Sequence, residues 1–176
     1  MNLDDVSHQL AALHAEAFGW ALYCCRGDHA LAEEALQNAY VKWLEGRLRH
    51  DGASSLKTWW LGVIRLTAHE EFRRRRIRDS TLLRWLRGSL AEDEEPQDPA
   101  PHPARCAELD EESARLRRLL ARLPARQGEV LHLVFYEGLT LADAAAVMGV
   151  GLGSARKYYD LGKSRLRAWL EQENRP

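Results

Sequence analysis

An acidic run rich in proline divides the 176-residue chain near its middle. Within this run, AEDEEPQDPAPHPA, each proline lacks the backbone N–H that a helix needs; the prolines are Pro96, Pro99, Pro101 and Pro103. Residues 91–112 hold nine Asp and Glu against one Lys or Arg, so mutual repulsion favours an extended backbone. We therefore expect a flexible acidic linker over residues 88–110, with a separate structural unit on either side.

Both flanking segments show the spacing of amphipathic helices. Apolar residues recur three and four positions apart at Leu31, Ala35, Leu36, Ala39, Tyr40 and Trp43, and again at Leu116, Leu119, Leu120 and Leu123. Turn-forming residues mark the expected helix ends at Gly27-Asp28, Gly46, residues 52–55 and Pro124. No stretch of the chain shows the alternation of apolar and polar residues that is typical of β-strands. The sequence therefore predicts an all-α fold with two small helical domains, residues 1–87 and residues 111–176.

Residues 139–166 have the pattern of a helix-turn-helix. Thr140 and Asp143 form a capping box, in which the hydroxyl accepts from the third amide of the first turn. Gly149-Val150-Gly151 ends this short helix, because glycine readily enters the left-handed conformation of a tight turn. We expect a second, basic helix to follow the turn.

The second helix is suited to DNA. Ala155, Tyr159, Gly162 and Leu166 have core spacing, and the other side offers donors for phosphates and base edges at Ser154, Arg156, Lys157, Tyr158 and Arg165. A helical hairpin with a solvated basic face is the alternative. The cap, the glycine turn and the basic helix occur together, which favours DNA binding. Asp160 would repel a phosphate, accept from a cytosine amino group, or face away.

Residues 56–76 join a tryptophan pair to four consecutive arginines. Arginine is favourable at a helix C-terminus, but four in a row exceed what a cap needs. Trp59 and Trp60 are adjacent and cannot both face the core, which leaves one ring available. Cations beside an exposed aromatic ring are typical of a surface for single-stranded nucleic acid, although a protein partner would also suit such a surface.

Three blocks together resemble bacterial RNA polymerase sigma factors of the extracytoplasmic-function (ECF) type. AEEALQNAYVKW (32–43) and WWLGVIRLTAHEEFRR (59–74) are similar to the two conserved blocks of the family's N-terminal domain. Residues 123–167 are similar to the domain that reads the −35 promoter element. The blocks occur in the family's order on either side of an acidic linker.

The resemblance implies a transcription initiation factor that binds core RNA polymerase and directs it to promoters. It implies polymerase contacts at Glu34, Gln37 and Asn38. It implies −10 contacts and duplex melting by the N-terminal domain, through Lys57, Trp59, Trp60, Arg65, Arg73 and Arg74. The −35 element would be read by Ser154, Arg156, Lys157, Tyr158 and Arg165, and an anti-sigma factor is a further expected partner.

This chain departs from the family pattern at several positions. Leu66 stands where the family usually has Asn, and Glu70 stands where it has Asp. We therefore expect recognition and melting of the −10 element to differ from those of relatives. Gly151 replaces a usual Ser and removes an N-cap side chain. Residues 154–157 replace Thr-Val-Lys-Ser, so the −35 preference of relatives does not carry over.

Other functions fit the sequence less well. A helix-turn-helix regulator that does not dock on polymerase leaves the block at 32–43 and the linker unexplained. A metal or redox sensor built on His14, Cys24, Cys25 and His29 lacks the usual ligand spacing. No motif of an enzyme is present. We therefore expect no metal, no cofactor and no membrane insertion, and a cytoplasmic location.

Overall fold

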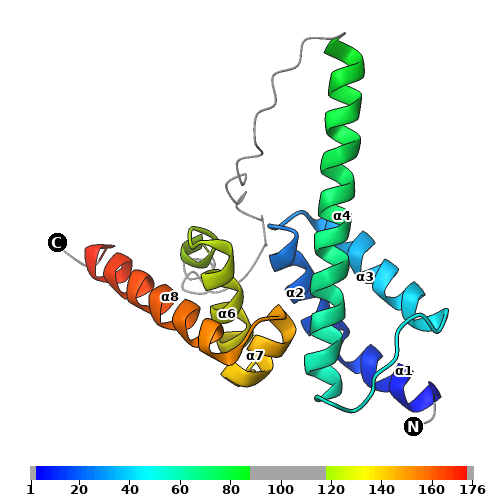
Figure 1. Ribbon diagram of the computed structural model, residues 1–176, viewed down its shortest axis with the longest axis horizontal. Coiled ribbons are helices and arrows are strands. Elements are labelled where there is room, and N and C mark those ends of the chain that lie inside the picture. The colour runs from blue at the N-terminus through cyan, green and yellow to red at the C-terminus, as the bar shows by residue number, and fades with distance from the viewer. Residues whose placement is uncertain (1–2, 88–117, 174–176) are drawn as a thin grey trace.

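The computed structural model describes residues 3–87 and 118–173, and all regular structure in these two ranges is helical (Figure 1). This confirms the predicted all-α fold. The linker expected over residues 88–110 lies outside the described residues. The helices are α1 (Leu3–Ala12), α2 (His14–Cys24), α3 (His29–Leu44), α4 (Leu56–Arg87), α6 (Ala125–Phe135), α7 (Leu141–Met148) and α8 (Leu152–Glu173).

The N-terminal unit, residues 3–87, is built on three mutually packed helices, α2, α3 and α4. Trp20 and Trp60 are fully buried at its centre, and Trp20 Nε1 donates to Leu61 O at 2.9 Å. Asp28 caps α3 by accepting from Leu31 N at 3.0 Å, and Gly46 leaves that helix with a φ of +70°. The predicted helix ends are therefore confirmed here, whereas α4 continues well beyond the residue 76 suggested by the sequence.

The C-terminal unit, residues 118–173, contains the predicted helix-turn-helix. Thr140 caps α7 by accepting from Asp143 N at 3.1 Å, and the Thr140 hydroxyl donates back to the Asp143 carboxylate. Gly149 ends α7 in the left-handed conformation, with φ of +64°. Helix α8 then crosses α6 at close range, because a Cβ at Gly162 would lie 2.9 Å from Leu131 Cδ1. The predicted capping box and glycine turn are confirmed.

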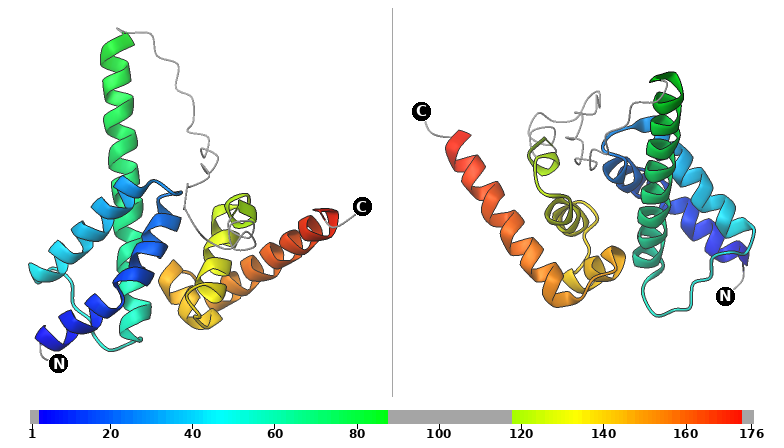
Figure 2. Two further views of the ribbon diagram at one scale, coloured as in Figure 1. Left: turned by 180° about the vertical axis from the view of Figure 1, so that it is seen from behind. Right: turned by 45° about the horizontal axis from the view of Figure 1, so that its top comes forward.

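The two units are in contact with each other. Helix α7 lies beside the first half of α4, and the second half of α4 projects away from the other helices (Figures 1 and 2). The aromatic side chains of α2 reach α6, with Tyr23 and His132 ring centroids 4.5 Å apart. The buried residues of both units belong to one continuous cluster. The sequence indicated two units but no contact between them.

None of the helices in the described ranges is long and apolar enough to cross a membrane.

Candidate nucleic-acid interface

Helix α8 presents a polar, basic face to solvent. Ala155 and Leu166 turn inward, with 0% and 8% of their surface exposed. Ser154, Arg156 and Lys157 are exposed on the first turns of the helix, directly after the Gly149 turn. This arrangement leaves hydroxyl, guanidinium and ammonium donors open to a ligand as large as a DNA groove.

Two other residues predicted on this face are less available. Tyr158 is partly buried. Arg165 is exposed, but its Nη1 donates to Gln127 Oε1 at 3.0 Å, which ties its guanidinium to α6. Asp160 is exposed, as is Leu161, which has 43% of its surface in solvent. A carboxylate and an apolar side chain therefore share the open part of α8 with the cations.

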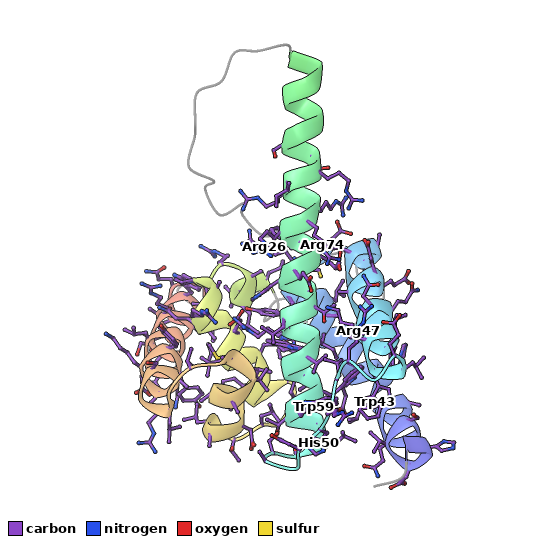
Figure 3. All side chains as sticks on the ribbon, turned by 45° about the vertical axis from the view of Figure 1, so that its right-hand side comes forward. Arg26, Trp43, Arg47, His50, Trp59 and Arg74 are labelled. Atoms are coloured by element: carbon purple, nitrogen blue, oxygen red, sulfur yellow. The ribbon has the colours of Figure 1, made fainter. Side chains whose placement is uncertain are left out.

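Trp59 stands at the start of α4 within a group of rings. Its ring centroid lies 5.7 Å from that of Trp43, edge to face, and 5.4 Å from that of His50. Figure 3 shows these three side chains together at one end of α4. Trp59 is only partly buried, so part of its ring remains open beside the loop that joins α3 to α4.

Trp60 is a core residue. It has no exposed surface, and its ring packs on Tyr40 at a centroid distance of 5.0 Å. The sequence indicated that the two adjacent tryptophans cannot both face the core, and in the structure Trp60 is the buried one. A base cannot stack on Trp60 in this structure, so we remove it from the candidate DNA contacts.

The arginine run on α4 is partly paired. Arg74 donates to Glu71 Oε1 at 2.9 Å and to Glu70 Oε1 at 2.7 Å, and Arg75 pairs with Asp28. Within the described ranges, neither Arg73 nor the exposed Arg76 forms an ion pair. Of the two arginines of this run that we predicted to contact DNA, Arg73 is therefore more available than Arg74.

Glu70 stands at the family's Asp position and is held as a carboxylate. A hydrogen bond from Lys42 Nζ to Glu70 Oε2 at 2.8 Å, followed by the charge of Lys42, lowers the pKa of Glu70 below its ordinary value. The carboxylate therefore neutralises part of the basic surface of α4 and links it to α3.

Arg65 and Lys57 point toward the C-terminal unit. Arg65 is 5% exposed, and its Nη2 lies 3.2 Å from Glu129 Oε2. Lys57 Nζ donates to Glu137 O at 2.8 Å and lies 2.7 Å from Glu16 Oε2. Neither cation is open to DNA in this arrangement. The family resemblance implied a DNA contact for Arg65, and nothing in the sequence reveals its partner 64 residues away.

The outer face of α3 carries the predicted polymerase contacts. Glu34 and Gln37 are exposed, and Asn38 is partly buried, with its Nδ2 donating to Glu71 Oε1 at 3.1 Å. The same face carries two apolar residues that the sequence analysis missed, Val41 at 47% exposure and Leu44 at 69%. Their spacing from Gln37 was the available signal, since positions i, i+4 and i+7 lie on one side of a helix. We name Glu34, Gln37, Val41 and Leu44 the α3 face.

Cys24 and Cys25 lie inside the N-terminal unit as buried free thiols, and burial raises the pKa of both, that of Cys25 to about 12. No cluster of three or more His, Cys, Asp or Glu side chains suited to a metal occurs in the part of the chain that the structure describes.

Comparison with known proteins identifies similar sequences over both units. The family model described as Sigma-70, region 4 matches residues 113–166. An ECF RNA polymerase sigma factor, RpoE of Cereibacter sphaeroides, is 30% identical over 77% of this chain and 70% of its own length. The ECF RNA polymerase sigma factor SigF of Caulobacter vibrioides is 34% identical over 72% of this chain, which spans 61% of that relative's length.

Two solved structures share the fold. The sigma factor RpoE of Bartonella quintana, in complex with the anti-sigma factor NepR, matches with a TM-score of 0.66 at 23% identity, over 95% of this chain and 97% of that one. CnrH, in complex with the cytosolic domain of CnrY, matches with a TM-score of 0.61 at 19% identity, over 95% and 88%. At these identities the likeness concerns the arrangement of helices.

Proposed function

The chain belongs to the ECF family of RNA polymerase sigma factors, and we propose that it binds core RNA polymerase and directs it to specific promoters. The observation that carries this proposal is the exposed basic start of α8 behind the Gly149 turn, within the segment matched by the sigma region 4 model. Polymerase carries out the chemistry of transcription, so the chain itself acts as an initiation factor and not as an enzyme. Its place of action would be the cytoplasm, where polymerase and promoter DNA meet.

In this proposal α8 reads the −35 element from the major groove. Arg156 and Lys157 are free to donate to phosphates or to the acceptor edge of guanine, and Ser154 adds a donor that can also accept. Tyr158 and Arg165 contribute at the edge of this surface, since each is already engaged with the rest of the unit. The helix N-terminus points its amides toward the DNA, which favours the phosphate backbone.

The N-terminal unit opens and holds the −10 element. Trp59 supplies a stacking surface worth about 1–3 kcal/mol per base. Arg74 lies farther along α4 (Figure 3), and with its neighbour Arg73 it supplies positive charge. The exposed Leu66 lies between them on α4, at 66% exposure, and offers apolar contact where relatives usually offer an amide. We therefore expect a −10 preference that differs from that of relatives with Asn at this position.

The α3 face would dock on core polymerase. It combines carboxylate and amide groups with the apolar side chains of Val41 and Leu44, a mixture typical of protein interfaces. An anti-sigma factor is a second proposed partner, because one structural neighbour was solved in complex with an anti-sigma factor and the other in complex with the cytosolic domain of CnrY. Such a partner would compete for the surfaces that polymerase and DNA use.

Run-off transcription with purified core enzyme on a pool of genomic promoter fragments tests the proposal. We expect starts at a limited set of fragments that share two sequence elements. If the chain binds DNA sequence-specifically but forms no complex with core enzyme at low salt, it is a regulator that does not act as a sigma factor. If neither binding occurs, the proposal fails entirely.

A matched pair of variants tests the role of α8. The double variant Arg156→Ala/Lys157→Ala should lose −35 binding strongly, whereas Lys163→Ala/Arg167→Ala removes the same charge from the side of α8 that lines a groove with Phe135. Equal losses in the two variants on all DNA sequences, with only the salt dependence changed, would mean that Arg156 and Lys157 touch phosphate alone.

A further inference from the structure

Asp160 is an acidic residue within the basic helix that we propose to read DNA. Between Leu152 and Leu170, helix α8 carries three arginines and two lysines, and Asp160 is its one acidic residue. DNA phosphates repel a carboxylate, so Asp160 weakens any binding that depends on phosphate contacts alone. The phosphate contacts proposed for Arg156 and Lys157 therefore give Asp160 no role.

Asp160 lies on the solvent side of α8. Two residues mark the side that packs on the rest of the unit: Ala155 has no exposed surface, and a Cβ at Gly162 would lie 2.9 Å from Leu131 Cδ1. A helix turns by about 100° per residue, which places Asp160 about 140° from Ala155 and about 160° from Gly162. Asp160 is accordingly exposed. Its carboxylate is on the face of α8 that a DNA groove would meet.

Arg156 precedes Asp160 by one turn on this open face. Side chains four residues apart on a helix are neighbours, with Cβ atoms about 5–6 Å apart, and an arginine and an aspartate at this spacing can form an ion pair. In the two described ranges, however, no ion pair joins Arg156 to Asp160, and the Asp160 carboxylate accepts no hydrogen bond. Both groups are therefore available to the same ligand.

The base edges of the major groove distinguish a carboxylate from a cation. Guanine presents the acceptors N7 and O6, thymine presents the acceptor O4, and adenine presents the acceptor N7 beside its N6 amino group. Cytosine presents a donor, its N4 amino group, and no acceptor. An ionised carboxylate accepts hydrogen bonds and donates none. Of the four bases, cytosine is therefore the one that a carboxylate in the groove favours most.

The separation of Arg156 and Asp160 fits base pairs that lie close together. Four residues advance a helix by about 6 Å along its axis. Successive base pairs of B-form DNA are about 3.4 Å apart. Arg156 can therefore donate to the N7 and O6 acceptors of a guanine while Asp160 faces a cytosine within about two base pairs of it. The two side chains together suit a −35 element that contains G·C pairs.

We propose that Asp160 is a specificity-determining residue of the −35 surface and accepts a hydrogen bond from the N4 amino group of one cytosine in the −35 element. The inference rests on the proposed reading of the −35 element by α8, and it adds the identity of one base. Thymine at this place is disfavoured twice, because the amino donor is lost and the O4 acceptor faces the carboxylate.

Promoter selection by the holoenzyme tests the proposal. Core enzyme is combined with the full-length wild-type chain, with Asp160→Ala or with Glu171→Gln, and each holoenzyme selects from a promoter pool that is randomised over the −35 element. Wild type should prefer cytosine over thymine at least about 5-fold at one position of either strand. Asp160→Ala should lower this preference at least about 3-fold and change the preferences at the other positions less than about 2-fold.

Glu171→Gln is the matched control. It removes the same charge from an exposed residue of the same helix, 11 residues beyond Asp160. It should keep the base preferences of the wild-type chain at all positions. A loss of the cytosine preference in both variants would mean that net charge, and not the place of Asp160, sets the preference, and the proposal would be overturned.

Removal of the amino group from the DNA provides a second test. The selected cytosine is replaced by 2-pyrimidinone, which lacks the 4-amino group, in a promoter duplex bound by the wild-type or the Asp160→Ala holoenzyme. The loss of base pairing is common to both proteins, so the difference between them reports the contact itself. We expect the replacement to weaken wild-type binding at least about 3-fold more than binding of Asp160→Ala. Equal weakening would refute the contact.

The outcomes separate failure of this inference from failure of the proposed function. If Asp160→Ala keeps every base preference and binds all sequences more tightly, with an altered salt dependence, Asp160 only repels phosphate and the inference is wrong. A preference for adenine that is lost in Asp160→Ala would also overturn it. If the wild-type holoenzyme selects no −35 sequence at all, the proposed reading by α8 fails together with the inference.

Discussion

Replacing Gly128 with alanine should destabilise the chain through a single oxygen atom of the other unit. The new methyl group would overlap the hydroxyl of Tyr23, whose ring is packed between Trp20 and His132 at centroid distances of 5.5 and 4.5 Å. Because both neighbouring rings hold Tyr23 in place, it cannot turn aside freely. Overfilling a packed interior costs about 1–3 kcal/mol, whereas Gly→Ala inside a helix gains about 1 kcal/mol. We expect a net loss of up to about 2 kcal/mol.

Removal of that oxygen should reverse the effect. In a Tyr23→Phe background the alanine methyl would have the ring carbon Cζ at 3.5 Å as its nearest neighbour in the N-terminal unit, an ordinary contact. The backbone oxygen of Leu120 would remain at 3.2 Å within its own unit. Gly128→Ala should therefore be neutral or stabilising in this background, with a coupling free energy of about 1–3 kcal/mol between positions 23 and 128.

Urea denaturation of the four chains of this double-mutant cycle measures the coupling. Gly153→Ala is the control, since a Cβ at that position on α8 meets nothing within 4 Å. It should change stability equally with Tyr23 or Phe at position 23. A coupling below about 0.5 kcal/mol between positions 23 and 128 would mean that α2 and α6 do not touch in the free chain, and the reasoning would be refuted.

Three further predictions concern charge, stacking and docking. Burial alone would raise the pKa of Glu129, but the hydrogen bond from His69 and the charge of Arg65 hold it below its ordinary value. The folded wild-type chain should therefore lose stability as the pH drops below about 4.5, where Glu129 becomes protonated. The urea midpoint of Glu129→Gln should depend less on pH in that range. Trp59→Ala should slow promoter opening about 5- to 100-fold, as followed by permanganate footprinting, and a template with a pre-melted −10 region should restore most of the rate. Leu44→Glu should weaken binding to core enzyme at least 10-fold, as measured by fluorescence anisotropy. Ile77→Glu, the same kind of apolar-to-acidic change at an exposed residue of α4, should not weaken it.

Local signals in the sequence predicted local structure well. The Thr140 cap, the Gly149 turn and the ends of α3 each depend on residues within a few positions of one another, and each is present in the structure. Such signals act through the backbone of their own turn, so tertiary packing does not change them.

Contacts between the units could not be predicted in this way. The sequence did not reveal which partner covers each side of α4. Trp60 and Arg65 were both grouped with the DNA-facing residues, yet Trp60 is buried by its own unit and Arg65 by Glu129 of the other. The pairing of Arg65 with Glu129 depends on a meeting of helices 64 residues apart, which a single sequence does not record.

The contact between α4 and α6 contains a buried ion pair. Such a pair adds little net stability, because the attraction between Arg65 and Glu129 is largely offset by the loss of their hydration. Removal of one partner alone would cost more, because it would leave the other charge buried and unpaired. The pair therefore specifies how α4 meets α6 more than it stabilises the fold.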